Sequence, residues 1–302
     1  MPTPLITICL PAFKADRYLS ETLASVRAQR FSGWELIVVE DGSRDRTEGL
    51  VQEFARQVHQ SVRFVRHEKN QGLPATRNTA IELARGIWIA LLDADDIWTA
   101  DHLSHLFGLA QQTGADVLHS GVVMFDSDSG VDLEVRAPDE TALAEFPLSL
   151  FRRRYPIQPS STLLRRERLA AVGGFDAGTR YVEDFELWMR LVRTGACFAF
   201  SPEATCRYRQ HGAAMTRHAS AMALGLASVY ERNADWPAAP VALRRRLASE
   251  GWFAAGRLLF RGDPAEAAEC FRKALRHRPY SAVLWIYRCA ALGLSGGKSL
   301  VK

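Results

Sequence analysis

Three carboxylates fall within four residues at Asp93-Ala94-Asp95-Asp96, directly after the apolar run 87–92. Carboxylates this close repel one another, and a divalent cation would offset the repulsion. Magnesium or manganese held by one or two carboxylates keeps coordination positions open for substrate phosphates. The pattern therefore predicts a cation site that handles phosphates. The alternative is a solvated acidic turn that caps the following helix.

Four other segments combine polar side chains with turn residues: Glu40-Asp41-Gly42-Ser43, 70–78, 181–188 and 208–212. The second is a Gly/Pro loop that leads into a helix whose first turn carries Arg77, which suits a bound anion. Each segment also has an ordinary structural explanation: a βα turn, a helix cap, acidic residues that complement a helix dipole, or a loop histidine. Taken singly, none of the four decides a function.

The elements that must position these residues alternate between short apolar runs and helix-period segments. The runs that predict strands are 5–10, 35–39, 62–65, 87–92 and 117–123. The segments that predict helices are 20–29, 47–58, 76–84 and 103–112. This alternation is typical of βαβ units, so we expect an α/β fold with a mostly parallel sheet flanked by helices. Pro11, Asp41 and Asp93 then follow the carboxyl ends of strands, where such sheets bind ligands.

The rest of the chain is less regular. Residues 126–150 read as loop-rich, 160–164 as a strand, 183–193 as a helix, and 197–200 and 205–209 as short strands. From residue 219 onward the pattern is helical. Gly262, Ala267, Phe271, Ala274 and Pro279 have the offsets of one tetratricopeptide-like hairpin. Because a single copy cannot bury its faces alone, a helical appendage packed on the main domain is favoured over a peptide-binding array.

Charge is divided unevenly along the chain. Residues 1–235 hold 26 Lys and Arg against 30 Asp and Glu, whereas residues 236–302 hold 12 against 4, a net of +8. We expect this basic tail to meet an anionic surface, a membrane leaflet or a lipid-diphosphate acceptor, with a solvated helical face as the alternative. Its arginines alternate with apolar positions and no recognition motif is evident, so no nucleic-acid partner is expected.

Composition and cysteine usage exclude several classes. Hydrophobic residues make up 47% of the chain, which excludes a disordered or fibrous protein. The five cysteines form no C-x-x-C pair, which argues against a disulfide framework or a zinc site. A secretory leader is not evident, and no run reaches the roughly eighteen apolar residues of a spanning helix. We expect a cytoplasmic protein, with peripheral attachment to the inner face of the membrane as a second option.

Five motifs in this order resemble the inverting glycosyltransferases of family 2, over roughly residues 5–216. They are Pro11-Ala12-Phe13 with 40–43, Asn70 to Asn78, Asp93 to Asp96, Gly173-Gly174-Phe175-Asp176 with Glu183-Asp184, and Tyr208 to Gly212. The resemblance implies a GT-A (Rossmann-like) catalytic domain over residues 1–218. Residues 219–302 would form a basic helical C-terminal region.

The resemblance also implies roles for individual residues. Pro11, Ala12 and Phe13 would contact the donor's nucleoside, and Asp41 its base. Arg77 would lie near the nucleotide, and Asp93 would bind the ribose or the metal shell. Asp95 and His211 would hold the metal. Asp184 would be the catalytic base, and Glu183 and Trp188 would shape the acceptor side.

The implied reaction moves a sugar from a nucleotide-diphosphate donor, a UDP-sugar, to a hydroxyl of a glycan or lipid-linked acceptor, with Mn²⁺ or Mg²⁺ as cofactor. A cation neutralises the leaving diphosphate, and a carboxylate base activates the attacking hydroxyl. The Gln-x-x-Arg-Trp motif of long-polymer relatives is absent, so one or a few sugars would be added, in cell-surface glycan assembly. The alternatives are a sugar nucleotidyltransferase, which normally carries a basic Gly-rich loop after the first strand, and a non-catalytic helical-repeat adaptor.

Overall fold

A computed structural model of the chain describes residues 3–179, 181–211 and 219–298. The chain divides into two compact units. The first, the sheet unit, comprises Met1–Gly178 and Glu183–Gly212, and the second, the helical unit, comprises Thr179–Val182 and Ala213–Lys302. Gly212 of the last sequence motif and the residues just before the predicted boundary at 218/219 lie outside the described residues. That boundary therefore stays a prediction.

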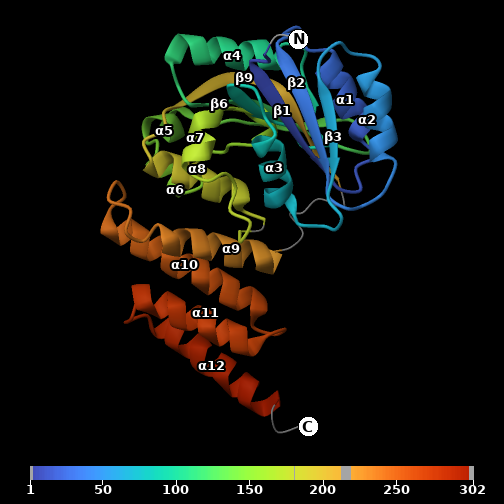
Figure 1. Ribbon diagram of the computed structural model, residues 1–302. Coiled ribbons are helices and arrows are strands. Elements are labelled where there is room, and N and C mark those ends of the chain that lie inside the picture. Colours follow the sequence, from blue (N-terminus) through green and yellow to red (C-terminus); the bar gives the residue numbers. More distant parts are fainter. Residues whose placement is uncertain (1–2, 180, 212–218, 299–302) are drawn as a thin grey trace. The chain divides into compact units, whose positions relative to one another are not determined.

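The described part of the sheet unit forms one nine-stranded sheet in the order β3-β2-β1-β4-β8-β6-β9-β5, with β7 paired to β6 (Figure 1). Its strands are β1 Ile6–Ala12, β2 Trp34–Glu40, β3 Val62–Arg66, β4 Trp88–Leu91, β5 Ile97–Trp98, β6 Val117–Asp126, β7 Asp132–Arg136, β8 Thr162–Arg165 and β9 Phe198–Gln210.

The two halves of the sheet differ in strand direction. Strands β3, β2, β1 and β4 are mutually parallel. Beyond them, β8 runs antiparallel to β4 and β6, β9 is parallel to β6, and β5 is antiparallel to β9. The predicted α/β fold with flanking helices is confirmed, and the sheet is parallel in the half that carries the first three sequence motifs.

Helices cover the sheet where the sequence is apolar on both faces of a strand. All seven residues of β1 and of β2 are buried. Alternate β1 residues such as Ile8 and Leu10 share a core with Leu19 and Leu23 of α1 and Val51 of α2. Helix α3 packs against β1 and β2. The helices of this unit are α1 Leu19–Arg27, α2 Thr47–Ala55, α3 Leu73–Glu82, α4 His102–Thr113, α5 Glu140–Ala144, α6 Leu148–Phe151, α7 Arg166–Ala171 and α8 Glu183–Arg193.

Two regions differ from the sequence prediction. Residues 126–150, expected as loop, contain β7, α5 and α6. All five residues of β7 are exposed and α5 and α6 are one turn each, so no buried run or long period marked them. The two short strands expected at 197–200 and 205–209 are one strand, β9. Pro202 and Glu203 lie where the register between β9 and β6 shifts. Proline lacks an N–H to donate to the neighbouring strand, and a bulge in β9 accommodates it.

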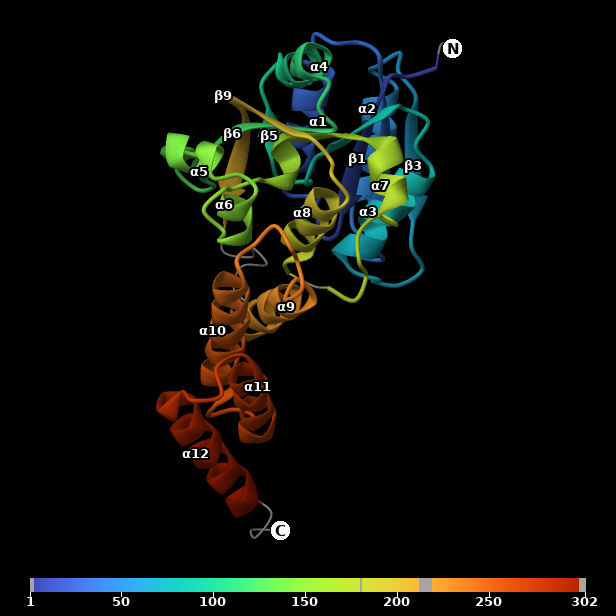
Figure 2. The same ribbon diagram turned by 90° about the vertical axis from the view of Figure 1, so that its left-hand side faces the viewer.

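The helical unit contains α9 Ala219–Arg232, α10 Val241–Leu259, α11 Pro264–His277 and α12 Ala282–Lys298 (Figure 2). Helices α10 and α11 approach closely where Gly256 faces Phe271. A Cβ on Gly256 would lie only 2.6 Å from the Phe271 ring. Phe271 and Ala274, two positions of the predicted hairpin, are fully buried. Among the described helices of the whole chain, none is long and apolar enough to cross a membrane.

Candidate active site

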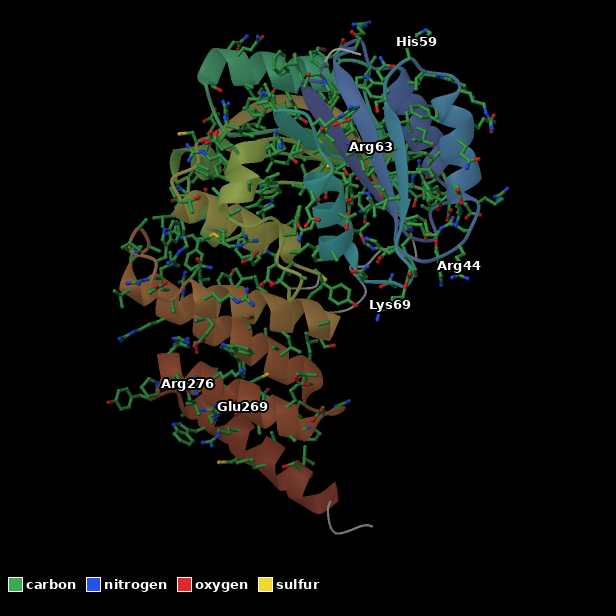
Figure 3. All side chains as sticks on the ribbon, viewed as in Figure 1. Arg44, His59, Arg63, Lys69, Glu269 and Arg276 are labelled. Atoms are coloured by element: carbon green, nitrogen blue, oxygen red, sulfur yellow. The ribbon has the colours of Figure 1, made fainter. Side chains whose placement is uncertain are left out.

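The carboxyl ends of β1, β2 and β4 bring the first sequence motifs to one edge of the sheet. Ala12 ends β1, and its carbonyl accepts a hydrogen bond from the Asp41 N–H at 2.8 Å. Phe13, the next residue, keeps 46% of its surface exposed. Figure 3 shows Arg44 and Lys69, which follow β2 and β3, at this end of the sheet. The edge therefore combines an exposed aromatic ring with exposed cations, which suits a nucleotide.

Asp41 organises the loop that precedes α3. Its Oδ1 accepts hydrogen bonds from the Gln71 N–H at 2.9 Å and lies 2.7 Å from His67 Nδ1, and its Oδ2 accepts from the Gly72 N–H at 2.8 Å. Gly42 has φ +81°, and a Cβ there would lie 2.8 Å from the Lys69 backbone. Asp41 is thus a buried anchor of this loop, and its predicted contact with a nucleotide base stays a prediction.

Arg77 links the end of β4 to the start of α8. Its side chain is 1% exposed, and it donates to Asp93 Oδ1 at 2.7 Å and to Glu183 Oε1 at 3.3 Å. Burial lowers the pKa of Arg77, but the carboxylates of Asp93 and Glu183 outweigh this effect and the pKa is raised. The guanidinium is therefore a permanent charge between two carboxylates. The predicted nucleotide contact of this buried side chain stays a prediction.

Asn78 fixes the glycine motif that leads toward α8. Its Nδ2 donates to the Phe175 carbonyl at 2.8 Å, and its Oδ1 accepts from the Phe175 N–H at 2.8 Å. Gly174 has φ +70°, and a Cβ there would lie only 2.5 Å from Asn78 Oδ1. A side chain at this position is disfavoured by both conformation and space. Two motifs that are far apart in the sequence are thus bound to each other.

Glu183 and Asp184 open α8 beside this cluster. Burial raises the pKa of Glu183, and the Arg77 guanidinium opposes that shift without cancelling it. Burial likewise raises the pKa of Asp184, whose Oδ1 accepts from the Phe185 N–H at 2.7 Å. A carboxylate with a raised pKa takes up a proton more readily, which suits a general base.

Trp188 lies one helical turn after Asp184 and is part of the core. Its side chain is 2% exposed, and its Nε1 is buried with no hydrogen-bond partner among the described residues. A ring so covered offers almost no face to a sugar in this conformation. The geometry thus lends no support to an acceptor contact by Trp188, and that role stays a prediction.

Asp95 and His211 meet although they are far apart in the sequence. Asp95 Oδ2 and His211 Nε2 are 2.8 Å apart, and both side chains are partly exposed. Two ligand atoms at right angles, each about 2.1 Å from one cation, lie about 3.0 Å apart, so the pair fits a shared cation with little movement. Within the described ranges, no cluster of three or more His, Cys, Asp or Glu side chains could hold a metal. Phosphate oxygens and water would have to complete the coordination.

The sequence analysis did not identify Asp96 and Arg209, which lie next to the Asp95–His211 pair, as site residues. Asp96 is fully buried, and its Oδ1 accepts from the Arg209 N–H at 3.0 Å. Burial, and then the charges of Asp95 and Asp93, raises the pKa of Asp96 well above its usual range. Arg209 donates through Nε to the Asp95 carbonyl at 2.7 Å. It also pairs with Glu21 at 2.8 Å. The sequence places both residues inside motifs, but only the fold shows that Arg209 bonds the Asp95 carbonyl and that Asp96 bonds the Arg209 N–H.

Sequence relatives of this chain are glycosyltransferases. The profile of the family described as "Glycosyl transferase family 2" matches residues 7–169. TuaG of Bacillus subtilis, a putative teichuronic acid biosynthesis glycosyltransferase, is 26% identical over 68% of this chain and 79% of its own length. WfgD of Escherichia coli is a UDP-Glc:alpha-D-GlcNAc-diphosphoundecaprenol beta-1,3-glucosyltransferase. It is 30% identical over 41% of this chain and 48% of its own length.

Solved structures share the fold. TarS 1-349 of S. aureus in complex with UDP-GlcNAc superposes with a TM-score of 0.70 at 17% identity, over 90% of this chain and 81% of that one. The mannosyltransferase PcManGT of Pyrobaculum calidifontis, in complex with GDP-Man and Mn²⁺, gives a TM-score of 0.62 at 17% identity, over 96% and 86%. Because the family profile spans more than half of the sequence and the fold agrees, this chain belongs to glycosyltransferase family 2 and has the GT-A fold.

Proposed function

We propose that this protein is a metal-dependent inverting hexosyltransferase that moves one sugar, or a few, from a UDP-sugar to a hydroxyl of a glycan or lipid-linked acceptor. The observation that carries the proposal is the Arg77 bridge. Arg77 bonds Asp93, two residues before Asp95, and it bonds Glu183, the neighbour of Asp184. The segments that carry the candidate donor residues and the candidate base are thereby connected through Arg77.

The donor side would lie at the edge formed by β1, β2 and β4. Pro11, Ala12 and the exposed ring of Phe13 would line the nucleoside. The carboxylate of Asp41 keeps acceptor capacity for a base N–H beyond its three present bonds. Support for a nucleotide-sugar donor comes from relatives whose structures contain UDP-GlcNAc, UDP or GDP-Man.

Asp95 and His211 would hold the cation. A carboxylate and an imidazole suit Mn²⁺ well, whereas Mg²⁺ favours oxygen ligands alone. When bound, the cation would neutralise charge on the leaving diphosphate. Arg209 would keep the Asp95 backbone in place through the bond to its carbonyl. One fold relative was solved with Mn²⁺, which supports the choice of metal.

Asp184 would act as the base. Its carboxylate would accept the proton of the acceptor hydroxyl while the hydroxyl oxygen forms a bond to the anomeric carbon and the bond from that carbon to the diphosphate breaks. Attack from the side opposite the leaving group inverts the anomeric centre. Arg77 would hold Glu183, and with it the first turn of α8, on the acceptor side, where Trp188 would support the helix. We place the reaction in cell-surface polysaccharide synthesis on the cytoplasmic side.

The Asp184→Asn variant tests this assignment. The full chain would be incubated with Mn²⁺ and UDP-glucose, UDP-N-acetylglucosamine or GDP-mannose, and donor binding and slow hydrolysis by water would be measured. We expect the variant to bind the donor like the wild type and to lose hydrolysis by about 10²-fold or more, the typical contribution of a general base. Asp128→Asn, at an exposed position, is the matched control. Undiminished hydrolysis by Asp184→Asn would place the base elsewhere, and no binding of any donor would overturn the proposed function.

A further inference from the structure

Helix α12 exposes an apolar face that a solvent-facing helix does not normally have. Among its described side chains, only Leu284 and Ala291 are buried. The large apolar side chains that remain exposed on this helix are Val283, Trp285, Ile286, Leu292 and Leu294. Ile286 is the most exposed of these side chains, at 66%. A helix that packs on one side and faces water on the other carries polar residues on its outer face, and here that face is apolar.

Cationic and aromatic side chains border this face. Arg276 and Arg278, at the end of α11, are exposed, and Tyr280 in the following turn is 98% exposed. The guanidinium of Arg288 lies over the Trp285 ring, 5.5 Å from its centroid. The sequence of α12 contains no Asp or Glu.

The acidic residue nearest along the chain on α11 is already neutralised. Glu269, which Figure 3 labels together with Arg276, pairs with Arg272 at 2.5 Å. The charge that remains around the start of α12, from Arg276, Arg278 and Arg288, is therefore positive. This agrees with the net +8 of residues 236–302.

Apolar side chains bordered by arginines and aromatic rings are the features of a helix that lies in a membrane interface. A second copy of the chain on the same face would bring two strongly basic regions together, which costs electrostatic energy. An anionic bilayer has an apolar interior that can cover the apolar side chains and negative headgroups that attract the arginines. At about 1.5 Å per residue the 17 residues of α12 are too short to span a bilayer.

We propose that α12 docks this protein on an anionic phospholipid bilayer and lies in the plane of the interface. The α12 surface comprises Arg276, Arg278, Tyr280, Val283, Trp285, Ile286, Arg288, Leu292 and Leu294. This inference does not rest on the proposed reaction, since it concerns a different unit of the chain and different residues.

Vesicle co-sedimentation of the full chain is the first test. Binding is expected to phosphatidylcholine vesicles that contain phosphatidylglycerol and not to pure phosphatidylcholine, and it should weaken as salt is raised. Ile286→Glu should lower the partition coefficient by about tenfold or more. Val135→Glu is the matched control, because Val135 lies on β7 and is 63% exposed. The pair Arg276→Glu and Arg278→Glu should also lose about tenfold, whereas Arg56→Glu on the sheet unit should not.

A fluorescent label locates the contact. Cys289 and Cys197 are exposed, whereas Cys9, Cys206 and Cys270 are buried. An environment-sensitive fluorophore on Cys289 in a Cys197→Ser background should shift to the blue on anionic vesicles. The same label on Cys197 in a Cys289→Ser background should not.

Several results would overturn the proposal. They are no binding to anionic vesicles, equal binding by Ile286→Glu, or a response of the Cys197 label alone. Sedimentation velocity tests the alternative that a second copy of the chain covers the α12 surface. A dimer that Ile286→Glu dissociates, in a chain without affinity for vesicles, would show that a second copy covers the face.

Discussion

The sheet unit and the helical unit each hold side chains in an unusual environment: buried charges in the first, and exposed apolar side chains on α12 in the second. The sheet unit buries charge, with Arg77 1% exposed between Asp93 and Glu183. In the helical unit, α12 exposes large apolar side chains, and Ile286 among them is 66% exposed. Burying charge is costly and persists where it positions a reaction. Exposing apolar side chains is costly in water and persists where something covers them. We propose that each of these features marks a place where the chain interacts with another molecule.

Replacement of Arg77 should have the largest effect on stability. Arg77→Met leaves Asp93 and Glu183 without their shared cation, and breaking a buried ion pair costs about 3–5 kcal/mol. The free energy of unfolding in urea, followed by circular dichroism, measures this loss. Arg245→Met, at an exposed position of α10, should leave it unchanged. A loss below about 1 kcal/mol for Arg77→Met would show that the cluster is not held by this charge.

Alanine should cost less stability at Gly173 than at Gly174. Gly173→Ala puts a Cβ in open space at φ +78°, so only backbone strain of about 1 kcal/mol is expected. Gly174→Ala adds a clash with Asn78 Oδ1, and about 2–3 kcal/mol is expected. Asn78→Ala in the Gly174→Ala background removes the clash and should make the two changes non-additive in a double-mutant cycle. Equal losses for the two glycines would mean that the Asn78 contact does not constrain the loop.

Asp116 is a paired carboxylate outside the candidate site, and its contribution to the free energy of unfolding should depend on pH. Burial raises its pKa, but hydrogen bonds from the Cys197 N–H and from Arg168 outweigh burial and lower it. Because the folded pKa is depressed, the stabilisation is present above the unfolded pKa and is lost as the pH falls through the folded one. Asp116→Asn should therefore cost about 1.5 kcal/mol at pH 7, and this difference should shrink in acid. A difference independent of pH would point to packing instead of charge.

The smallest effect is expected on α12. Ile286→Ser should change the unfolding free energy by less than about 0.5 kcal/mol, because the side chain is already largely exposed. Leu284→Ala, at a buried position of the same helix, should cost about 2–3 kcal/mol. If Ile286→Ser were as costly as Leu284→Ala, then the α12 face would already be covered in the isolated protein.

The positions of the main elements could be predicted where burial is continuous. The runs before Asp41 and Asp93 are strands because both of their faces are covered, and the predicted helix 183–193 has the bounds of α8. The first strand was expected to end before Pro11, but β1 continues through Pro11 to Ala12. Only the resemblance suggested that Asp95 and His211 share a site, and the structure places their side chains 2.8 Å apart.

Other features depend on contacts that no local pattern encodes. Arg77 reads as a helix residue suited to an anion, and only the fold shows that two carboxylates of the protein already occupy its guanidinium. Trp188 belongs to an apolar helix stripe, and a stripe does not tell whether the ring faces the core or a ligand. The apolar period of α12 predicts a helix, but it does not show that the outer face stays uncovered.

We propose that Asp95 and His211 together hold the cation to which the donor diphosphate binds. Electron paramagnetic resonance of Mn²⁺, titrated with the full chain in the presence of UDP, tests it most directly. We expect bound Mn²⁺ in the wild type and strongly weakened binding in both Asp95→Ala and His211→Ala. Retention of wild-type Mn²⁺ binding by either variant would contradict it.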